Sequence, residues 1–136
     1  MIDKEIIKIA SNTENHGVLD HHTHFSKLKN SICGDEMKIY LIVKNDKITN
    51  FKYECESCIY CQASVSLLSR KAKNKSIEKF KHFIHQAKNC FEKNTNSFGK
   101  EWKEFDKIMK KNNISRKECL LLPINTMLDA LSKKSL

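Results

Sequence analysis

Several residue types that build phosphate-binding loops and membrane segments are scarce in this chain of 136 residues. It contains three glycines and one proline, and neither GxGxxG nor GxxxxGK[ST] occurs. Nucleotide phosphates are usually held by such glycine-rich loops, so nucleotide chemistry is disfavoured. No apolar run approaches the roughly 20 residues of a membrane-spanning helix. We therefore expect no membrane among the partners of this protein.

Arginine is also rare, although the chain is strongly basic. The formal net charge is +9, yet Arg70 and Arg116 are the only arginines among 25 basic residues. Nucleic-acid recognition favours the planar guanidinium group, and here the lysines are scattered from Lys4 to Lys134 without a dense block. We interpret the charge as a solvated lysine surface that attracts acidic proteins, and we expect no nucleic-acid partner.

The length and composition predict one globular domain over residues 1–136, because 40% of the residues are hydrophobic and domains of this size are common. The first ten residues lack the basic start and long apolar stretch of a secretory signal, so we expect a cytoplasmic protein. In a reducing compartment, the six cysteines are expected to be metal ligands or reactive thiols before disulfides.

The hydrophobic pattern predicts a mixed α+β fold. It favours a short amphipathic helix and then two strands, at residues 2–10, 37–43 and 48–53. Asn45 and Asp46 mark a hairpin turn between the strands. The polar residues 11–35 before them are rich in loop formers. Helical apolar stripes follow at residues 63–72, 77–91 and 102–109. We expect a small antiparallel β-sheet packed against a layer of helices.

The last predicted helix carries two local signals. Ser115 and Glu118 fit a capping box, so the helix is expected to begin at Ser115. Pro123 lies within the same pattern, where it lacks an N–H donor and collides with the preceding turn at a cost of about 3 kcal/mol. We therefore expect a kink or break at Pro123.

Three cysteines lie at junctions between the predicted elements. Cys33 precedes the first strand, Cys58 follows the hairpin, and Cys119 falls in the first turn of the last helix. Free N–H groups at a helix N-terminus favour the thiolate, which is both the nucleophile and the metal ligand. Two cysteines of a C-x-x-C pair cannot complete a tetrahedral site. A mixed site of three thiolates and one carboxylate could hold zinc or part of an iron-sulfur cluster, and its oxygen ligand would make a cluster easier to release.

Four segments between Asn15 and Leu131 match the pattern of one family in the same order. They are Asn15-His16-Gly17-Val18-Leu19, Asn30-Ser31-Ile32-Cys33-Gly34-Asp35, Tyr53-Glu54-Cys55-Glu56-Ser57-Cys58 with Ala63-Ser64-Val65-Ser66, and Arg116-Lys117-Glu118-Cys119-Leu120. With these segments the chain resembles the NifU/IscU/SufU-type iron-sulfur cluster assembly scaffolds. The resemblance implies an IscU/SufU-like fold and the ligands Cys33, Asp35, Cys58 and Cys119.

The resemblance also implies a function. A scaffold of this type would receive sulfur from a cysteine desulfurase and iron from a donor, and it would pass a labile cluster, of [2Fe-2S] type, to recipient apoproteins. The interval from Cys58 to Cys119 (119 − 58 = 61 residues) is similar to that of the SufU-like branch, whose members hold zinc. The alternative is therefore a zinc-dependent sulfurtransferase with Cys33 as the sulfur acceptor, and a third possibility is a purely structural zinc protein. Whether the chain is an enzyme depends on this choice.

The chain departs from the family pattern at several positions. Ser31 replaces a usual proline, and Cys55 and Ser57 stand where glycines are usual, although a Cβ resists positive φ. Glu118 stands where histidine or lysine is usual, and it could be a ligand, a proton acceptor or part of the capping box.

Other candidate ligands have structural alternatives. Cys61 could supply a spare thiolate or simply pack in the first turn of a helix. Cys90 is expected in the core because it lies on an apolar stripe. The tract of His21, His22 and His24 is typical of metal binding, but the resembling family uses this segment for packing and partner contact.

Overall fold

A three-stranded antiparallel sheet supports the helices in the computed structural model, which describes residues 3–32, 34–93 and 98–132. The strands follow one another in the sheet in chain order and are β1 (His24–Lys29), β2 (Glu36–Lys44) and β3 (Lys47–Glu56). The predicted hairpin is confirmed. Asn45 and Asp46 turn it with φ of 52° and 62°, the left-handed conformation that a two-residue hairpin turn requires.

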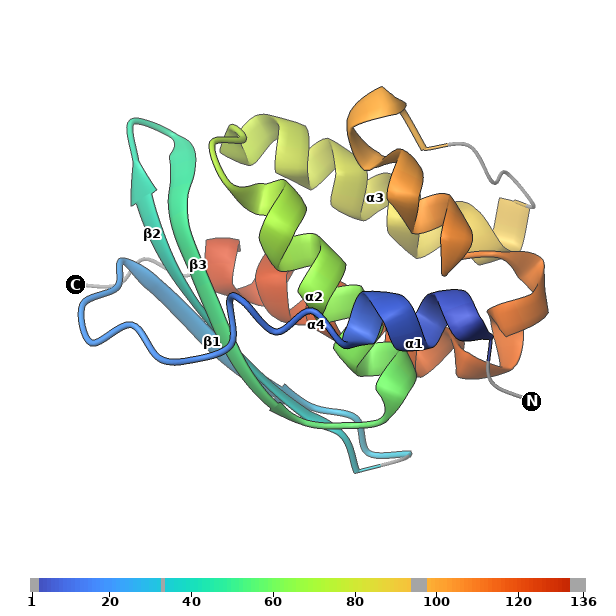
Figure 1. Ribbon diagram of the computed structural model, residues 1–136. Coiled ribbons are helices and arrows are strands. Elements are labelled where there is room, and N and C mark those ends of the chain that lie inside the picture. Colours follow the sequence, from blue (N-terminus) through green and yellow to red (C-terminus); the bar gives the residue numbers. More distant parts are fainter. Residues whose placement is uncertain (1–2, 33, 94–97, 133–136) are drawn as a thin grey trace.

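The helices cover one face of the sheet (Figure 1). The α-helices are α1 (Lys4–Ala10), α2 (Ile59–Ala72), α3 (Ile77–Lys93) and α4 (Lys117–Ser132), and the 3₁₀ helices are η1 (Lys100–Lys107) and η2 (Lys111–Arg116). α4 packs on β1 and β2, and α2 packs on β3, while α3 and η1 lie farther from the sheet. The predicted α+β architecture is therefore confirmed. None of the helices in the described part of the chain is long and apolar enough to cross a membrane.

One hydrophobic core joins the sheet to the helices. Side chains alternate between the two faces of a strand, so Met37, Ile39 and Leu41 of β2 all point toward the helices and are fully buried. The core continues from Ile6 in α1 to Leu131 in α4. The start of α2 and the start of α4 are thereby fixed against the same sheet.

The strand β1 was not expected from the sequence, which predicted loops there. Its covered face carries Ser26 instead of a large apolar residue, and the Ser26 hydroxyl donates a hydrogen bond to Asp129 of α4. Phe25 lies on the opposite face of the sheet and packs against Tyr40, with ring centroids 5.0 Å apart. The strand therefore lacks a clear alternation between apolar residues on its covered face and polar residues on its other face. It is nevertheless fully paired with β2.

The expected start of the last helix at Ser115 and a break at Pro123 were both wrong. α4 begins at Lys117, and Ser115 already lies inside η2, so it does not cap the α-helix. α4 also continues through Pro123 without a break. Pro123 is buried, and the helix around it packs against α2, α3 and the sheet, which offsets the missing backbone hydrogen bond. The predicted helical stripe at residues 102–109 is largely the 3₁₀ helix η1.

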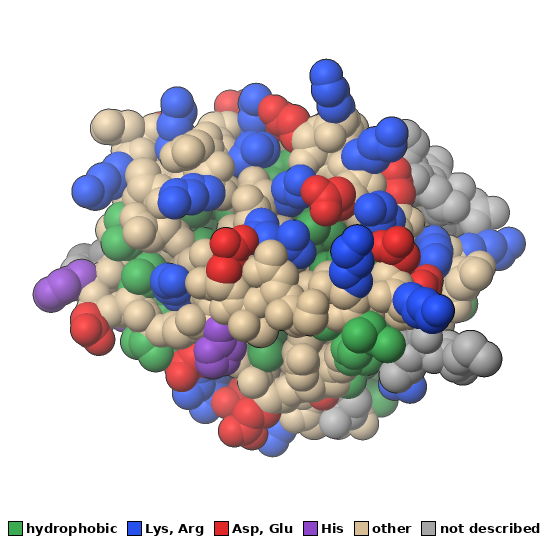
Figure 2. All heavy atoms as spheres, in the orientation of Figure 1, with side chains coloured by type: hydrophobic (Ala, Val, Ile, Leu, Met, Phe, Trp, Pro, Cys, Tyr) green, Lys and Arg blue, Asp and Glu red, His purple; other side chains and the backbone are tan. Residues whose placement is uncertain are grey.

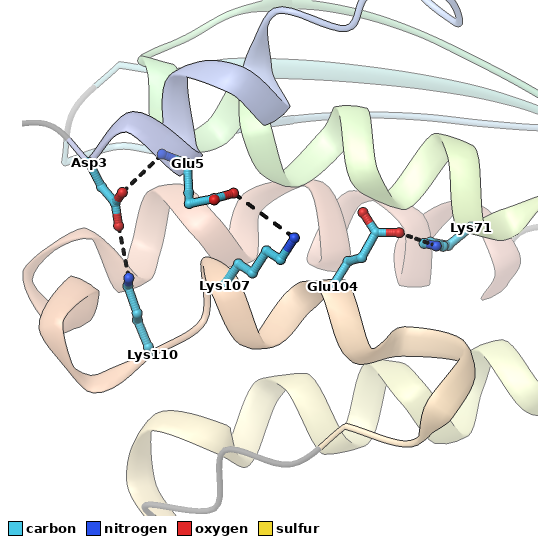
Figure 3. A network of polar contacts seen from close by, with 6 residues as sticks. All are labelled: Asp3, Glu5, Lys71, Glu104, Lys107 and Lys110. Atoms are coloured by element: carbon cyan, nitrogen blue, oxygen red, sulfur yellow. Dashed lines mark hydrogen bonds and ion pairs between the residues drawn. The ribbon is translucent and has the colours of Figure 1, made fainter.

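Charged side chains attach η1 and its neighbouring turn to the N-terminal helices (Figure 3). Glu104 pairs with Lys71 of α2 at 2.5 Å, and Lys110 pairs at 2.8 Å with Asp3, which also caps α1 by accepting the Glu5 N–H. Acidic side chains also lie between the lysines over the face seen in Figure 2. The lysines on this face are therefore solvated, as interpreted from the sequence, and they alternate with carboxylates.

Candidate metal centre

Three separate elements bring two thiols and one carboxyl group together. Asp35 precedes β2, Cys58 is the N-cap residue of α2, and Cys119 lies in the first turn of α4. One donor atom of each residue lies within 4.8 Å of the other two. Donors around one zinc ion lie about 3.8 Å apart when the bonds are about 2.3 Å long and tetrahedral, so a small contraction would let all three bind one ion.

The Asp35 carboxyl group shows that this set of donors fits a cation. Asp35 is 7% exposed, and its Oδ2 atom is buried without a hydrogen-bond partner among the described residues. A buried carboxylate oxygen without a partner is unfavourable, because folding removes its bonds to water. A metal ion held between this oxygen and the two thiolates would supply the missing interaction.

The loop that carries Asp35 is closed by backbone hydrogen bonds. The Asn30 N–H donates to the Asp35 carbonyl, and the Gly34 N–H donates to the Asn30 carbonyl, both at 2.7 Å. The Asn30 side chain accepts the Ile32 N–H at 3.0 Å. Gly34 has φ of +76°, which glycine adopts without strain. Cys33, the predicted fourth ligand and sulfur acceptor, lies outside the described residues.

A buried serine joins the two helices that carry the thiols. The Ser64 hydroxyl of α2 donates to the Leu120 carbonyl of α4 at 2.7 Å, next to Cys119. On the surface, the Arg116 guanidinium lies 5.2 Å from the centre of the Tyr60 ring. From the sequence, Ser64 was recognised only as part of the motif Ala63-Ser64-Val65-Ser66. Its role depends on a contact between residues 56 positions apart, which no local pattern reveals.

We expect Ser64→Ala to weaken metal binding by roughly tenfold, since residues that orient ligands commonly have effects of this size. The lost hydrogen bond should also lower the free energy of unfolding by about 1 kcal/mol. Ser66→Ala is the matched control, because its hydroxyl donates at 2.6 Å to Asn12 and not to α4. Calorimetric titration with zinc should separate the two variants. Equal affinities would show that Ser64 does not position the thiols.

Two further cysteines adjoin the site without belonging to the group of three. Burial raises the pKa of the Cys61 thiol, and it raises the pKa of the Cys55 thiol as well; the nearby Ser57 hydroxyl offsets part of each rise. Cys61 is fully buried, which supports its interpretation as a packed residue in the resting protein. Cys55 is paired with Met37 at the end of β3, and neither Cys55 nor Ser57 has a positive φ. The turn before Cys58 therefore tolerates side chains at these positions.

The remaining candidate ligands lie elsewhere. Cys90 is buried as predicted, with its Sγ atom 4.0 Å from the Met109 Sδ atom. Glu118 is exposed and is not part of the group of three. The rings of His22 and Phe25 lie 5.7 Å apart, and His24 contacts the Thr23 hydroxyl. Within the described residues, the histidines form no group of potential metal ligands.

The N-terminal motif of the chain also packs beside the site. Gly17 donates its N–H to the Tyr53 carbonyl at 2.8 Å, and the Asn15 amide donates to Ser69 of α2 at 3.1 Å. Burial raises the pKa of Tyr53 to about 12, so this side chain is neutral and packs under the motif. These two hydrogen bonds connect the motif to β3 and α2, the elements that precede and follow Cys58 in the chain.

Comparison with known proteins identifies the family. Residues 1–94, more than half of the chain, match the family described as the NifU-like N terminal domain. The chain belongs to this family. The resemblance inferred from the four segments is thus confirmed at the level of the family. The matched residues include Asp35 and Cys58, while Cys119 lies beyond them and is placed beside the others by the fold.

Two similar proteins agree with this assignment. The iron-sulfur cluster assembly scaffold protein IscU of Thermotoga maritima is 29% identical over 135 residues, covering 99% of this chain and 95% of that protein. FiSufU of Fervidobacterium islandicum AW-1, named as a SUF-system cluster assembly scaffold, has a TM-score of 0.83 at 26% identity and 96% coverage of both chains.

A third comparison concerns the fold alone. A NifU-like protein (N-terminal) from Brucella abortus has a TM-score of 0.89 at 19% identity, covering 96% of this chain and 91% of that chain. The predicted IscU/SufU-like fold is therefore confirmed.

Proposed function

We propose that this protein is an iron-sulfur cluster assembly scaffold, with residues 1–136 forming one domain. Cys33, Asp35, Cys58 and Cys119 would hold a [2Fe-2S] cluster as cargo, and Cys33 would accept sulfur from a cysteine desulfurase. The observation that carries the proposal is the convergence of Asp35, Cys58 and Cys119 within 4.8 Å. Membership of the NifU-like family and the similarity to IscU of Thermotoga maritima support it.

The chemistry of the donors suits temporary storage. Thiolates bind iron firmly, whereas a carboxylate oxygen is a harder and weaker ligand for cluster iron. Cys58 is partly exposed, so an iron donor and recipient apoproteins can reach this edge of the site. We also propose a cytoplasmic location, where thiols are kept reduced.

A zinc-dependent sulfurtransferase is the second candidate. The interval of 61 residues between Cys58 and Cys119, similar to that of the SufU-like branch, favours it, and two or three thiolates with one carboxylate also suit tetrahedral zinc. Anaerobic reconstitution with ferrous iron and sulfide separates the candidates. A stable visible chromophore with roughly two irons per chain supports the scaffold. Retention of one zinc ion, no chromophore and faster turnover of a cysteine desulfurase would support the sulfurtransferase instead.

The role of Asp35 as the weakest iron ligand leads to a separate prediction. Asp35→Ala should make the reconstituted cluster persist longer, because removal of the carboxylate removes the ligand that we expect to exchange most easily. The measurement is the decay of the cluster absorbance after addition of an iron chelator. Glu36→Ala is the matched control, since Glu36 is the adjacent carboxylate but pairs with Lys27 outside the site. Faster decay in Asp35→Ala than in Glu36→Ala would contradict the role of Asp35.

A further inference from the structure

Cys61 lies one helical turn behind Cys58, and the proposed scaffold chemistry gives it no role. The turn between them is regular, because the Gln62 N–H donates to the Cys58 carbonyl at 3.0 Å. Residues three apart in a helix have β-carbons about 5–6 Å apart, and a disulfide needs about 4 Å. Cys58 is the N-cap residue with an extended backbone, so a small movement at the end of the helix would close this gap.

The two thiols differ sharply in their exposure. Cys58 is partly exposed, whereas Cys61 is fully buried. The other described donors, Asp35 and Cys119, are only 7% and 5% exposed. A sulfur donor outside the protein therefore reaches Cys58 most easily among these groups. Cys61 is shielded from outside reagents, but it lies only one helical turn from Cys58.

Cluster assembly requires sulfide, whereas a persulfide carries its outer sulfur at a higher oxidation level. Conversion of one to the other consumes two electrons, which a nearby thiol can supply by forming a disulfide. A partly exposed thiol with a buried thiol one turn away, at the N-terminus of a helix, is an arrangement suited to this exchange.

We propose that Cys58 and Cys61 act as a dithiol that reduces persulfide sulfur to sulfide within the site. This inference rests on the proposed scaffold function, with the sulfur first accepted by Cys33 passing to the Cys58 thiol by exchange, which returns Cys33 to the thiol. The Cys61 thiol loses its proton as its Sγ atom attacks the Cys58 Sγ atom of a Cys58 persulfide, and a bond forms between the two Sγ atoms. The bond from the Cys58 Sγ atom to the outer sulfur breaks, and the outer sulfur leaves with the electron pair as hydrosulfide. The proton of Cys61 passes to the solvent or to this leaving sulfide.

The reaction balances without an oxidant. One persulfide and one thiol give one disulfide and one hydrogen sulfide, so the sulfane sulfur is reduced and the two cysteines are oxidised. The sulfide is released beside Asp35 and Cys119, where the cluster is assembled. An external dithiol reductant must then reduce the Cys58–Cys61 disulfide before Cys58 can bind iron.

Cys55 is less suited to this role, although it is also three residues from Cys58. It lies in β3 and its backbone pairs with Met37 of β2, so movement toward Cys58 would disturb the sheet. Cys61, by contrast, can approach Cys58 through a change in the backbone of the N-cap residue alone, without disturbing the sheet. The two cysteines therefore make different predictions when each is replaced.

The test uses the full metal-free chain and glutathione persulfide, with no reductant present. Wild type should release about one hydrosulfide per chain and form a Cys58–Cys61 disulfide, detected by peptide mass spectrometry. Cys61→Ala should keep the persulfide on Cys58 and release sulfide only at the protein-free rate. Cys61→Ser should behave likewise, which guards against an effect of the cavity that alanine leaves. Cys90→Ala, another buried cysteine, and Cys55→Ala should behave as wild type.

Reconstitution with ferrous iron and sodium sulfide provides the second readout. Cys61→Ala should then form the same chromophore as wild type, because sulfide is supplied ready-made. Equal sulfide release by wild type and Cys61→Ala, or a disulfide between Cys55 and Cys58, would overturn the inference. A wild type that forms no chromophore from ferrous iron and sodium sulfide would instead contradict the proposed scaffold function. The two failures can be told apart, because the disulfide and sulfide measurements use the metal-free chain.

Discussion

Cys58→Ala should reduce the iron bound after anaerobic reconstitution from roughly two ions per chain to almost none. Cys58 provides one of two described thiols in the candidate site, and its Sγ atom lies within 4.8 Å of donor atoms of Asp35 and Cys119. With Cys58 absent, the remaining described donors are one thiol and one carboxyl group. The measurement is iron and sulfide analysis of the reconstituted protein, together with its visible absorbance.

Loss of the fold would not explain this result. Cys58 is partly exposed and makes no side-chain capping hydrogen bond, so its replacement should change the free energy of unfolding by less than about 1 kcal/mol. Cys90→Ala is the matched control, because Cys90 is buried in the core and contacts Met109. Cys90→Ala should lose stability but keep its iron. Full iron binding by Cys58→Ala would show that Cys58 is not an iron ligand.

Phe83→Ala should lower the free energy of unfolding by about 3–5 kcal/mol, which is a large part of the stability of a domain of this size. The Phe83 ring is fully buried and stacks on Trp102 of η1, with centroids 4.2 Å apart and planes 16° apart. It also contacts Phe105 of η1 at 4.7 Å. Phe83 thus joins η1 to α3, and alanine would leave a cavity at this junction.

Denaturant unfolding followed by tryptophan fluorescence measures this effect, because the single tryptophan lies against Phe83. Phe91→Ala in the same helix is the control, since Phe91 is only partly buried and should lose considerably less stability. The account of the aromatic cluster would be wrong if the two variants lost the same stability. At low denaturant, Phe83→Ala should still bind metal, because α3 contributes none of the candidate ligands.

The parts of the fold that were predictable are those determined by neighbouring residues. The hairpin follows from two β-rich runs and from Asn45-Asp46, whose side chains tolerate positive φ. By contrast, the partner of Ser26 in β1 is Asp129, at the other end of the chain. Local alternation cannot reveal such a partner, so the strand was mistaken for a loop.

The errors in the last helix have a similar cause. Proline inside an isolated helix lowers its stability, as the sequence argument assumed, but packing of α4 against the sheet, α2 and α3 offsets this cost at Pro123. Ser115 and Glu118 have the spacing of a capping box, yet the chain enters α4 through a 3₁₀ helix that provides the preceding turn. In both places tertiary structure outweighs a local signal.

The candidate site was predictable only in part from the residues themselves. The junction positions of Cys58 and Cys119 indicated reactive or metal-binding thiols, and the burial of Cys90 followed from helical spacing. The convergence of Asp35, Cys58 and Cys119 came from the family resemblance, because residues on three separate elements have no periodic relation. The pairing of Ser64 with α4 was inaccessible for the same reason.

Anomalous diffraction at the iron edge, from anaerobic crystals of the iron- and sulfide-reconstituted protein, tests the central claim most directly. The account predicts anomalous density between the Sγ atoms of Cys58 and Cys119 and the Asp35 carboxylate, within bonding distance of all three. Iron located instead at His21, His22 and His24, or at any position out of reach of Cys58 and Cys119, would contradict it.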